Sequence, residues 1–384
     1  MRFRTAAVAA ATTAAIAAAT VTGGGTAQAA GSTGCVQLNG HTVCRTDPRG
    51  GSDTSIVKEI VRQIDRTGRG DTVRASVYQW TLERPVRPVA ESLIKAKRRG
   101  VDVKVVIGRR GSAPAANNAV IAEFKDAGIA VKQCKGACLP NPAGRTKGPN
   151  HNRFFLIERD DRPTVITTSF NFTRFHTTQA HNLIAVHGDR SLHGFYNRYW
   201  QRLYKGSWKG WGERHKDTPG NGTHAWVFPR SADPIASQLK QVTGCAKGDR
   251  VWVAHANFQP NRPAVREQLG RIKRLGCDVK VVVLDKDTNS PSWIAKATGG
   301  GSVRVHSSLR DKFIVLDAEF NGKARQLVYT GTHNLNKNSM KNADDNLLRV
   351  GGKTVAGVYT DYFKRLWRGS ARLRLAGFAD GASP

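Results

Sequence analysis

The chain contains the segment RRGVDVKVVI at residues 98–107 and a similar segment, RLGCDVKVVV, at residues 274–283. Each starts with the basic end of a predicted helix, followed by Gly100 or Gly276, where a helix C-terminus needs positive φ. The unbroken Val and Ile run that follows is typical of a strand covered on both faces of a sheet. The pattern predicts, twice in one chain, a helix that leads into a central strand.

Four more pairs of segments match in the same order, so the chain reads as two copies of one unit. One match of short apolar segments could arise by chance, but five in register could not. The other matches are DTVRAS at 71–76 with DRVWVA at 249–254, FFLIE at 154–158 with FIVLD at 313–317, SFN at 169–171 with THN at 332–334, and HNLI at 181–184 with DNLL at 345–348.

Strands alternate with helices in both halves, which favours an α/β layered sheet. The Gly-, Lys- and Trp-rich segment 205–223 is expected to connect the halves. Each half is expected to contain a strand at 73–78 or 251–256, a helix at 89–98 or 264–274, a hairpin with its turn at 160–163 or 321–323, and a final helix at 191–204 or 354–367.

Basic residues and one histidine begin equivalent strands in the two halves. Because residues two apart on a strand point to the same face, His151 and Arg153 share one direction, as do Arg310 and Lys312. If the halves pack about a pseudo-two-fold axis, these groups converge on one small volume. The cations could bind phosphate oxygens, and His151 could attack phosphorus as a nucleophile. No metal ion or other cofactor is expected, since protein cations stabilise the developing charge.

A hydroxyl residue and an asparagine, separated by one residue, follow each of these strands. The asparagines would add neutral donors to the same volume. An acid also lies seven positions after the start of each segment, although an ordinary salt bridge at a strand end explains it almost equally well. The candidate catalytic residues are His151, Arg153, Asn171, Arg310, Lys312 and Asn334, and the supporting residues are Glu158, Ser169, Asp317 and Thr332.

This pattern resembles the phospholipase D superfamily, whose halves each carry His-x-Lys, a later Asp, and Gly-Ser-x-Asn. The resemblance extends from about Ser55 to Trp367 and is greatest to exported bacterial members. It implies two pseudo-symmetric α/β/α sandwich halves with mixed sheets, and a phosphohistidine intermediate at their interface. In that family one His is the nucleophile, the other is the general acid, and the Lys and Asn residues hold the phosphate.

The chain departs from the family pattern at several positions. Arg153 replaces the usual Lys, Glu158 the usual Asp and Thr168 the usual Gly. Arg310 occupies the place of the second His, and a guanidinium with a pKa above about 12 cannot be a general acid near neutral pH. His306 and His333 are possible substitutes, although position 333 is not usually catalytic in the family.

The N-terminus resembles a secretion signal. Arg2 and Arg4 precede an Ala-rich run at 6–19, and Ala27-Gln28-Ala29 (27–29) forms a small-x-small cleavage site. We therefore expect a secreted protein with a signal peptide at 1–29, a first half at 30–215 and a second half at 216–384. A membrane anchor is the weaker alternative, because the run is mostly Ala and Thr.

Six cysteines in an exported chain are expected to pair. The turn Asn39-Gly40 predicts a hairpin that places Cys35 opposite Cys44, where a bridge can form. Zinc binding is a less favoured interpretation of the second pair, which lacks further ligands at suitable spacing. The expected disulfides are Cys35–Cys44, Cys134–Cys138 and Cys245–Cys277.

The formal net charge of +31 predicts attraction to polyanions, either nucleic acid or an anionic membrane surface. A solvated basic surface is an equally good interpretation. The favoured function is a secreted phosphodiesterase that cleaves phospholipids. The alternatives are a nuclease with the same chemistry and a catalytically impaired protein that only binds polyanions or phosphate. A monomer is expected, since one chain carries both halves of the centre.

Overall fold

The computed structural model describes residues 33–109, 114–159, 162–210, 218–219, 222–286 and 289–373. The predicted signal peptide and the predicted boundary near residue 215 lie outside the described residues, as does part of the turn at 160–163. No helix within the described ranges is both long and apolar enough to cross a membrane.

The first half forms an eight-stranded sheet in the order β1-β2-β8-β7-β6-β3-β4-β5. Strands β3, β4 and β5 are parallel, and the others pair antiparallel. The strands are β1 (Gly34–Leu38), β2 (His41–Thr46), β3 (Thr72–Val77), β4 (Asp102–Ile107), β5 (Ala130–Gln133), β6 (Arg153–Glu158), β7 (Thr164–Thr168) and β8 (His181–His187). The helices are α1 (Ser55–Asp65), α2 (Arg87–Arg98), α3 (Pro114–Asp126), the 3₁₀ helix η1 (Arg174–Thr178) and α4 (Arg190–Lys205).

The second half repeats this order in a ten-stranded sheet, β18-β14-β13-β12-β15-β16-β17-β10-β9, with β11 paired to β15. The strands are β9 (Thr218–Pro219), β10 (Thr223–Val227), β11 (Val242–Gly244), β12 (Arg250–His255), β13 (Asp278–Leu284), β14 (Val303–His306), β15 (Lys312–Phe320), β16 (Lys323–Gly331), β17 (Asn346–Gly351) and β18 (Ala371–Arg372). The helices are α5 (Pro234–Lys240), α6 (Pro263–Arg274), α7 (Pro291–Thr298), η2 (Gly300–Ser302), α8 (Lys337–Lys341) and α9 (Lys353–Arg368).

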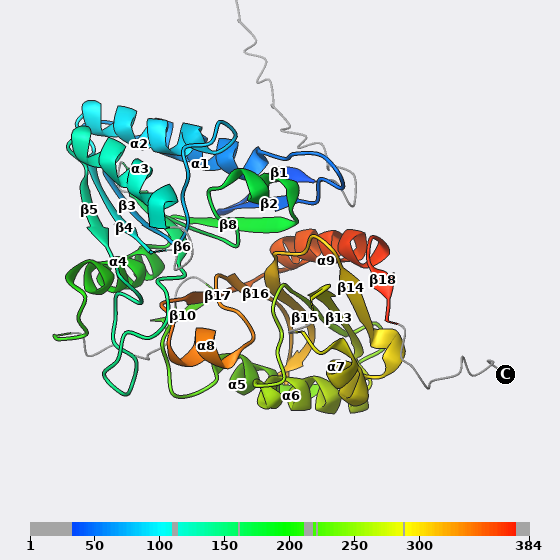
Figure 1. The fold of residues 1–384 in the computed structure, drawn as a ribbon. Helices are drawn as coiled ribbons and strands as arrows, with labels where there is room; N and C mark the ends of the chain where they lie inside the picture. Colours follow the sequence, from blue (N-terminus) through cyan, green and yellow to red (C-terminus); the bar gives the residue numbers. More distant parts are fainter. Residues whose placement is uncertain are drawn as a thin grey trace, which may run out of the picture.

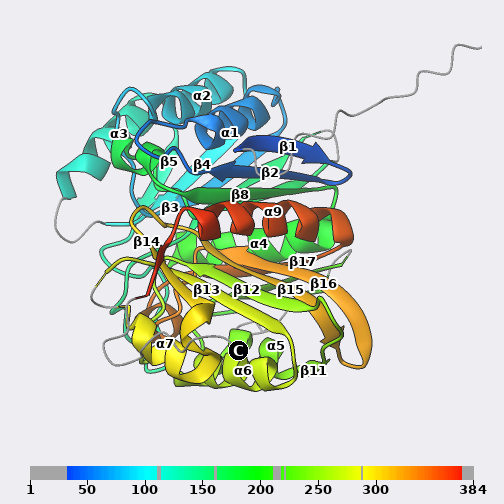
Figure 2. The same ribbon diagram turned by 90° about the vertical axis from the view of Figure 1, so that its right-hand side faces the viewer.

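The two sheets enclose a shared middle layer of helices. Helices α1 to α3 cover the outer face of the first sheet, and α5 to α7 cover the outer face of the second (Figure 1). Helices α4 and α9 lie between the sheets, and each contacts strands of both (Figure 2). The largest apolar core is this middle layer, which contains Phe154 and Tyr196 from the first half and Phe313 and Tyr359 from the second. The expected α/β fold with two mixed sheets is confirmed.

Most of the expected elements are present, with boundaries that differ by one or two residues. Gly100 and Gly276 follow α2 and α6 with φ of 89° and 97°, as expected for residues that end a helix. Two unexpected pairs of elements, α3 with β5 and α7 with β14, add a third parallel strand to each half. Neither pair carries a repeated segment that would have marked it.

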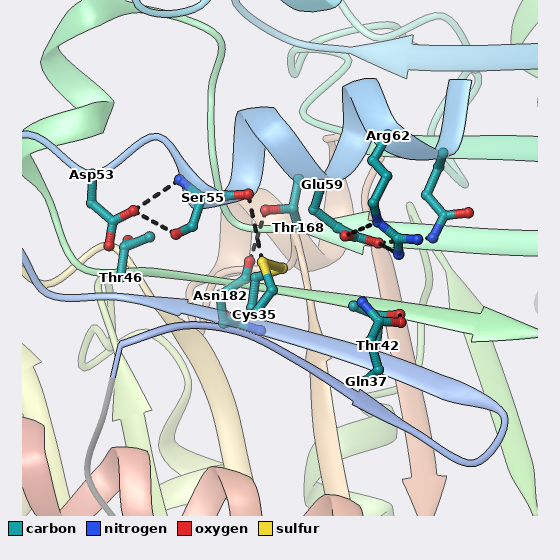
Figure 3. The surroundings of a disulfide bond; sticks show 12 residues. Cys35, Gln37, Thr42, Thr46, Asp53, Ser55, Glu59, Arg62, Thr168 and Asn182 are labelled. Carbon is teal, nitrogen blue, oxygen red and sulfur yellow. Dashed lines mark hydrogen bonds and ion pairs between the residues drawn. A yellow bond between two sulfur atoms is a disulfide. The ribbon is translucent and has the colours of Figure 1, made fainter. Parts of the chain in front are cut away.

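The N-terminal hairpin joins β1 to β2 in the expected register, with Cys35 opposite Cys44. Their Cα atoms are 3.9 Å apart and their sulfur atoms are bonded. Figure 3 shows this bridge beside the start of α1, where Asp53 accepts hydrogen bonds from the backbone and hydroxyl of Ser55. The structure also joins Cys134 to Cys138 and Cys245 to Cys277. Three disulfides in the described residues fit an oxidising environment.

Candidate active site

The halves exchange backbone hydrogen bonds where the candidate strands begin. The N–H of His151, just before β6, donates to Asp344 O at 2.8 Å, just before β17. The N–H of Arg310, just before β15, donates to Ala180 O at 2.9 Å, just before β8. Each strand start is therefore fixed against the opposite half, which brings the two motifs together.

One cavity of about 640 Å³ lies at this junction. Tyr78, His176 and His181 also line it, so the cavity contains three imidazoles as well as cations. It is lined by all six candidate catalytic residues, His151, Arg153, Asn171, Arg310, Lys312 and Asn334, and by Ser169.

His151 is held by a carboxylate from the opposite half. Its Nδ1 lies 2.8 Å from Oδ1 of the fully buried Asp345. That carboxylate also accepts hydrogen bonds from Thr332 Oγ1 at 2.7 Å and from the hydroxyl of Ser339. Because a carboxylate accepts, Nδ1 carries the proton and Nε2 keeps its lone pair. Burial, followed by the charge of Arg153, lowers the pKa of His151 to about 4. The imidazole is therefore neutral and oriented at neutral pH.

Two cations are buried beside this imidazole. Arg153 donates through Nε to Asn171 Oδ1 and through Nη1 to His151 O at 3.0 Å. Burial lowers its pKa to about 10. Lys312 donates through Nζ to Arg310 O at 3.1 Å, in the equivalent arrangement. Burial and the charge of Arg153 lower the pKa of Lys312 to about 7. Because two like charges are held out of water here, an anion bound between them would offset their repulsion and desolvation.

The remaining predicted residues complete the wall. Arg310 lies over the ring of Phe175, 5.4 Å from its centroid, and burial lowers its pKa. The amide of Asn171 is fixed at both ends, since Nδ2 donates to His176 Nε2 at 2.9 Å. Asn334 Oδ1 is buried without a hydrogen-bond partner among the described residues. That oxygen is therefore free to accept a hydrogen bond from a ligand.

Two supporting residues lie away from the site. Glu158 is the last residue of β6 and Asp317 lies within β15, opposite Thr72 and Arg250, and neither lines the cavity. At about 3.3 Å per strand residue, seven positions place them more than about 20 Å along the strand. Asp317 instead lies 3.6 Å from Arg250, so we assign these acids no role in the site. Thr332 acts on Asp345 and does not face the cavity.

Neither proposed substitute for the missing second histidine reaches the cavity lining. His333 stacks on Phe228 at 3.9 Å between centroids, and its Nε2 accepts from Arg262 at 2.9 Å. His306 Nε2 lies 3.9 Å from Asp47. Both imidazoles belong to the packing around the site.

Sequence reasoning assigned no chemistry to Asp345 or His181. The signal was present, because the repeated segments HNLI and DNLL align these two residues with each other. Tyr78 and His176 carried no such signal, since each lies outside the matched segments.

The family model for the cardiolipin synthase, PLD-like domain matches residues 60–204 and 239–367. The chain belongs to the phospholipase D superfamily. One matched segment lies in each of the two halves that line the cavity.

Known structures with the phospholipase D fold agree. Phosphatidylserine synthase from Haemophilus influenzae Rd KW20 superposes with a TM-score of 0.60 at 13% identity, covering 88% of this chain and 89% of that one. Polyphosphate kinase from Porphyromonas gingivalis superposes with a TM-score of 0.54 at 13% identity, covering 89% of this chain and 53% of that one. This chain therefore spans about half the length of that kinase. These identities show a shared fold alone. No curated protein gives a significant sequence match.

Proposed function

We propose that the protein is a secreted, metal-independent phosphodiesterase that cleaves phospholipids through a phosphohistidine intermediate on His151. The observation that carries the proposal is the neutral imidazole, oriented by Asp345, in one cavity with Arg153 and Lys312. The lone pair on Nε2 of a neutral imidazole can attack a phosphorus atom that lies in line with it.

The first step forms a bond between His151 Nε2 and phosphorus and breaks the bond to the leaving-group oxygen. Arg153, Lys312 and Arg310 stabilise the charge on the equatorial oxygens. Asp345 accepts from Nδ1–H and so stabilises the positive phosphoimidazole. In the second step, water or an alcohol attacks phosphorus and the P–N bond breaks, which regenerates the imidazole.

The names of the similar proteins favour a phospholipid over a nucleic acid. The matching domain family is named for cardiolipin synthase, and one fold neighbour is a phosphatidylserine synthase. A net charge of +31 suits association with an anionic membrane surface. The same charge would serve a nuclease, so plasmid nicking belongs in the test.

Adduct formation tests the chemistry. Purified, oxidised protein would be incubated with phosphatidylglycerol or phosphatidylethanolamine vesicles, or with plasmid DNA, and then quenched. We expect release of the lipid head group and a mass adduct on His151, both absent in His151→Ala. His41→Ala, a histidine outside the cavity, is the matched control. Plasmid nicking without lipid cleavage would assign the nuclease function, and the absence of any adduct would leave a phosphate-binding protein.

Secretion and a monomeric state complete the proposal. The Ala-rich N-terminus and the three disulfides support export. Mass spectrometry of protein from the culture medium should find a mature N-terminus near residue 30. Light scattering should give the mass of one chain, because both halves of the cavity come from a single polypeptide.

A further inference from the structure

The cavity contains a second imidazole in the place where the other half has an acid. Asp345 and His181 are aligned by the repeat, and the backbone beside them makes the same pair of bonds. Asp344 accepts from His151 N–H and donates to Pro149 O, while Ala180 accepts from Arg310 N–H and donates to Ser308 O. His181 is thus placed beside Arg310 as Asp345 is placed beside His151.

The side-chain contacts repeat as well. Ser169 Oγ lies 2.9 Å from His181 Nδ1, and Thr332 Oγ1 donates to Asp345 Oδ1 at 2.7 Å. Each hydroxyl also accepts a hydrogen bond from the backbone N–H of the asparagine that follows His181 or Asp345. The distances are 3.2 Å for Asn182 and 3.1 Å for Asn346. An imidazole therefore occupies the site of a carboxylate. An imidazole is therefore present beside the second motif, and the first half supplies it.

The other nitrogen of His181 is available. The side chain is fully buried, it borders the cavity, and Nε2 has no hydrogen-bond partner among the described residues. His176 differs, because Asn171 donates to its Nε2 and Thr173 Oγ1 lies 2.7 Å from its Nδ1. Of these two histidines, His181 is the one with a ring nitrogen left for a substrate.

The hydroxyl partner permits a change of protonation. Ser169 Oγ can donate to Nδ1 or accept from it, so it tolerates both the neutral and the charged ring. Burial, followed by the charges of His176, Lys312, Arg153 and Arg310, lowers the pKa of His181 well below 6.5 in the empty cavity. A bound phosphodiester anion offsets those positive charges and favours the protonated ring.

We propose that His181 is the catalytic residue that exchanges protons with the leaving group and the incoming water. This assignment rests on the proposed phosphohistidine chemistry at His151. As the bond between phosphorus and the leaving oxygen breaks, His181 Nε2–H gives its proton to that oxygen. When water attacks the phosphohistidine and the P–N bond breaks, the neutral Nε2 takes the proton from water. Arg310 then serves as a phosphate-binding cation.

Leaving-group dependence tests this role. A 4-nitrophenolate leaving group needs little protonation, whereas the alcohol released from phosphatidylglycerol needs a full proton. With bis(4-nitrophenyl) phosphate, His181→Ala should keep a burst of 4-nitrophenol within about tenfold of the unmodified rate, since only the proton transfer is lost. Turnover after the burst should slow, and the adduct on His151 should accumulate. With phosphatidylglycerol vesicles, the variant should lose about 10²–10⁴ in rate.

Controls separate His181 from its neighbours. His187→Asn, at the other end of β8, should leave both rates unchanged. His181→Gln keeps a hydrogen-bonding group near Ser169 and supplies a second folded variant. Lys312, whose pKa is lowered to about 7, is the competing proton donor. Lys312→Arg keeps the charge but cannot release a proton near neutral pH.

The outcomes distinguish the two proposals. Equal losses on both substrates, or no loss on vesicles, would refute the role of His181 while the adduct on His151 remained. Leaving-group dependence in Lys312→Arg but not in His181→Ala would transfer the role to Lys312. If the unmodified protein forms no adduct, the phosphohistidine chemistry itself fails.

Discussion

Replacing Lys312 with Met should stabilise the protein while destroying its proposed activity. Lys312 is only 7% exposed and lies at the cavity with the buried Arg153. Burial and that neighbouring charge lower its pKa from 10.5 to about 7. A bound phosphate would interact favourably with this positive charge. Without a ligand, desolvation and repulsion between like charges destabilise the folded state.

The size of the effect follows from that pKa. Because one pKa unit corresponds to about 1.4 kcal/mol, keeping Lys312 charged at neutral pH costs the fold about 4 kcal/mol. Met fills a similar volume without a charge. The lost hydrogen bond from Nζ to Arg310 O offsets about 2 kcal/mol of the gain. We therefore expect the free energy of unfolding to rise by about 2 kcal/mol at neutral pH.

The gain should depend on pH in a defined direction. Between the folded pKa of about 7 and the unfolded value of 10.5, the unfolded chain holds a proton that the folded protein has released. The stability of the unmodified protein therefore rises with pH across this window. The advantage of Lys312→Met should shrink accordingly and vanish by about pH 9.

Urea denaturation with the disulfides intact, followed by circular dichroism, measures this difference. Lys323→Met, at an exposed lysine on β16, is the matched control and should change stability little at either pH. Added inorganic phosphate should stabilise the unmodified protein more than the Lys312 variant, because ligand binding to the folded state alone raises stability. A variant no more stable than the parent at neutral pH, or a gain that persists unchanged at high pH, would refute the electrostatic reasoning.

Three further predictions follow from the contacts around His151. Asp345→Asn should slow adduct formation by about 10²–10⁴, because the amide no longer fixes the Nδ1–H tautomer; quenched-flow mass spectrometry measures the rate, and an unchanged rate would contradict the orienting role. Adduct formation should fall as pH drops towards about 4, since protonation of His151 removes the attacking lone pair; a rate independent of pH down to that value would contradict it. Asp344→Ala should lower the free energy of unfolding by about 1–3 kcal/mol, because the N–H groups of Cys138 and Leu139 lose their buried acceptor; an unchanged urea midpoint would argue against this role.

The sequence predicted the elements whose identity depends on local pattern. Apolar runs and the glycine after each helix marked β4 and β13, because burial on both faces and a positive φ leave direct traces in sequence. The repeat then implied that His151 and Lys312 belong to one centre. It worked because a duplicated unit places equivalent strand ends at equivalent points of the fold.

The contacts between the halves could not be predicted in the same way. Asp345 reaches His151 only because β17 of one half begins beside β6 of the other, and no local pattern encodes that approach. The distant placement of Glu158 follows from strand length, which the motif alone does not express. His306 and His333 are close to Arg310 and Asn334 in the sequence, but sequence proximity does not place either imidazole in the lining of the cavity.

The pairing of Arg310 with His181 has an electrostatic consequence for the whole cavity. A carboxylate at position 181, like Asp345 in the other half, would bind the Arg310 guanidinium and neutralise it. The neutral imidazole leaves that guanidinium free to interact with a phosphate oxygen. After burial and Arg153, the charge of Arg310 is a further cause that lowers the pKa of Lys312. Replacing an acid by an imidazole thus strengthens anion binding at the expense of stability in the empty state. The loss of stability is offset only when an anion is bound in the cavity.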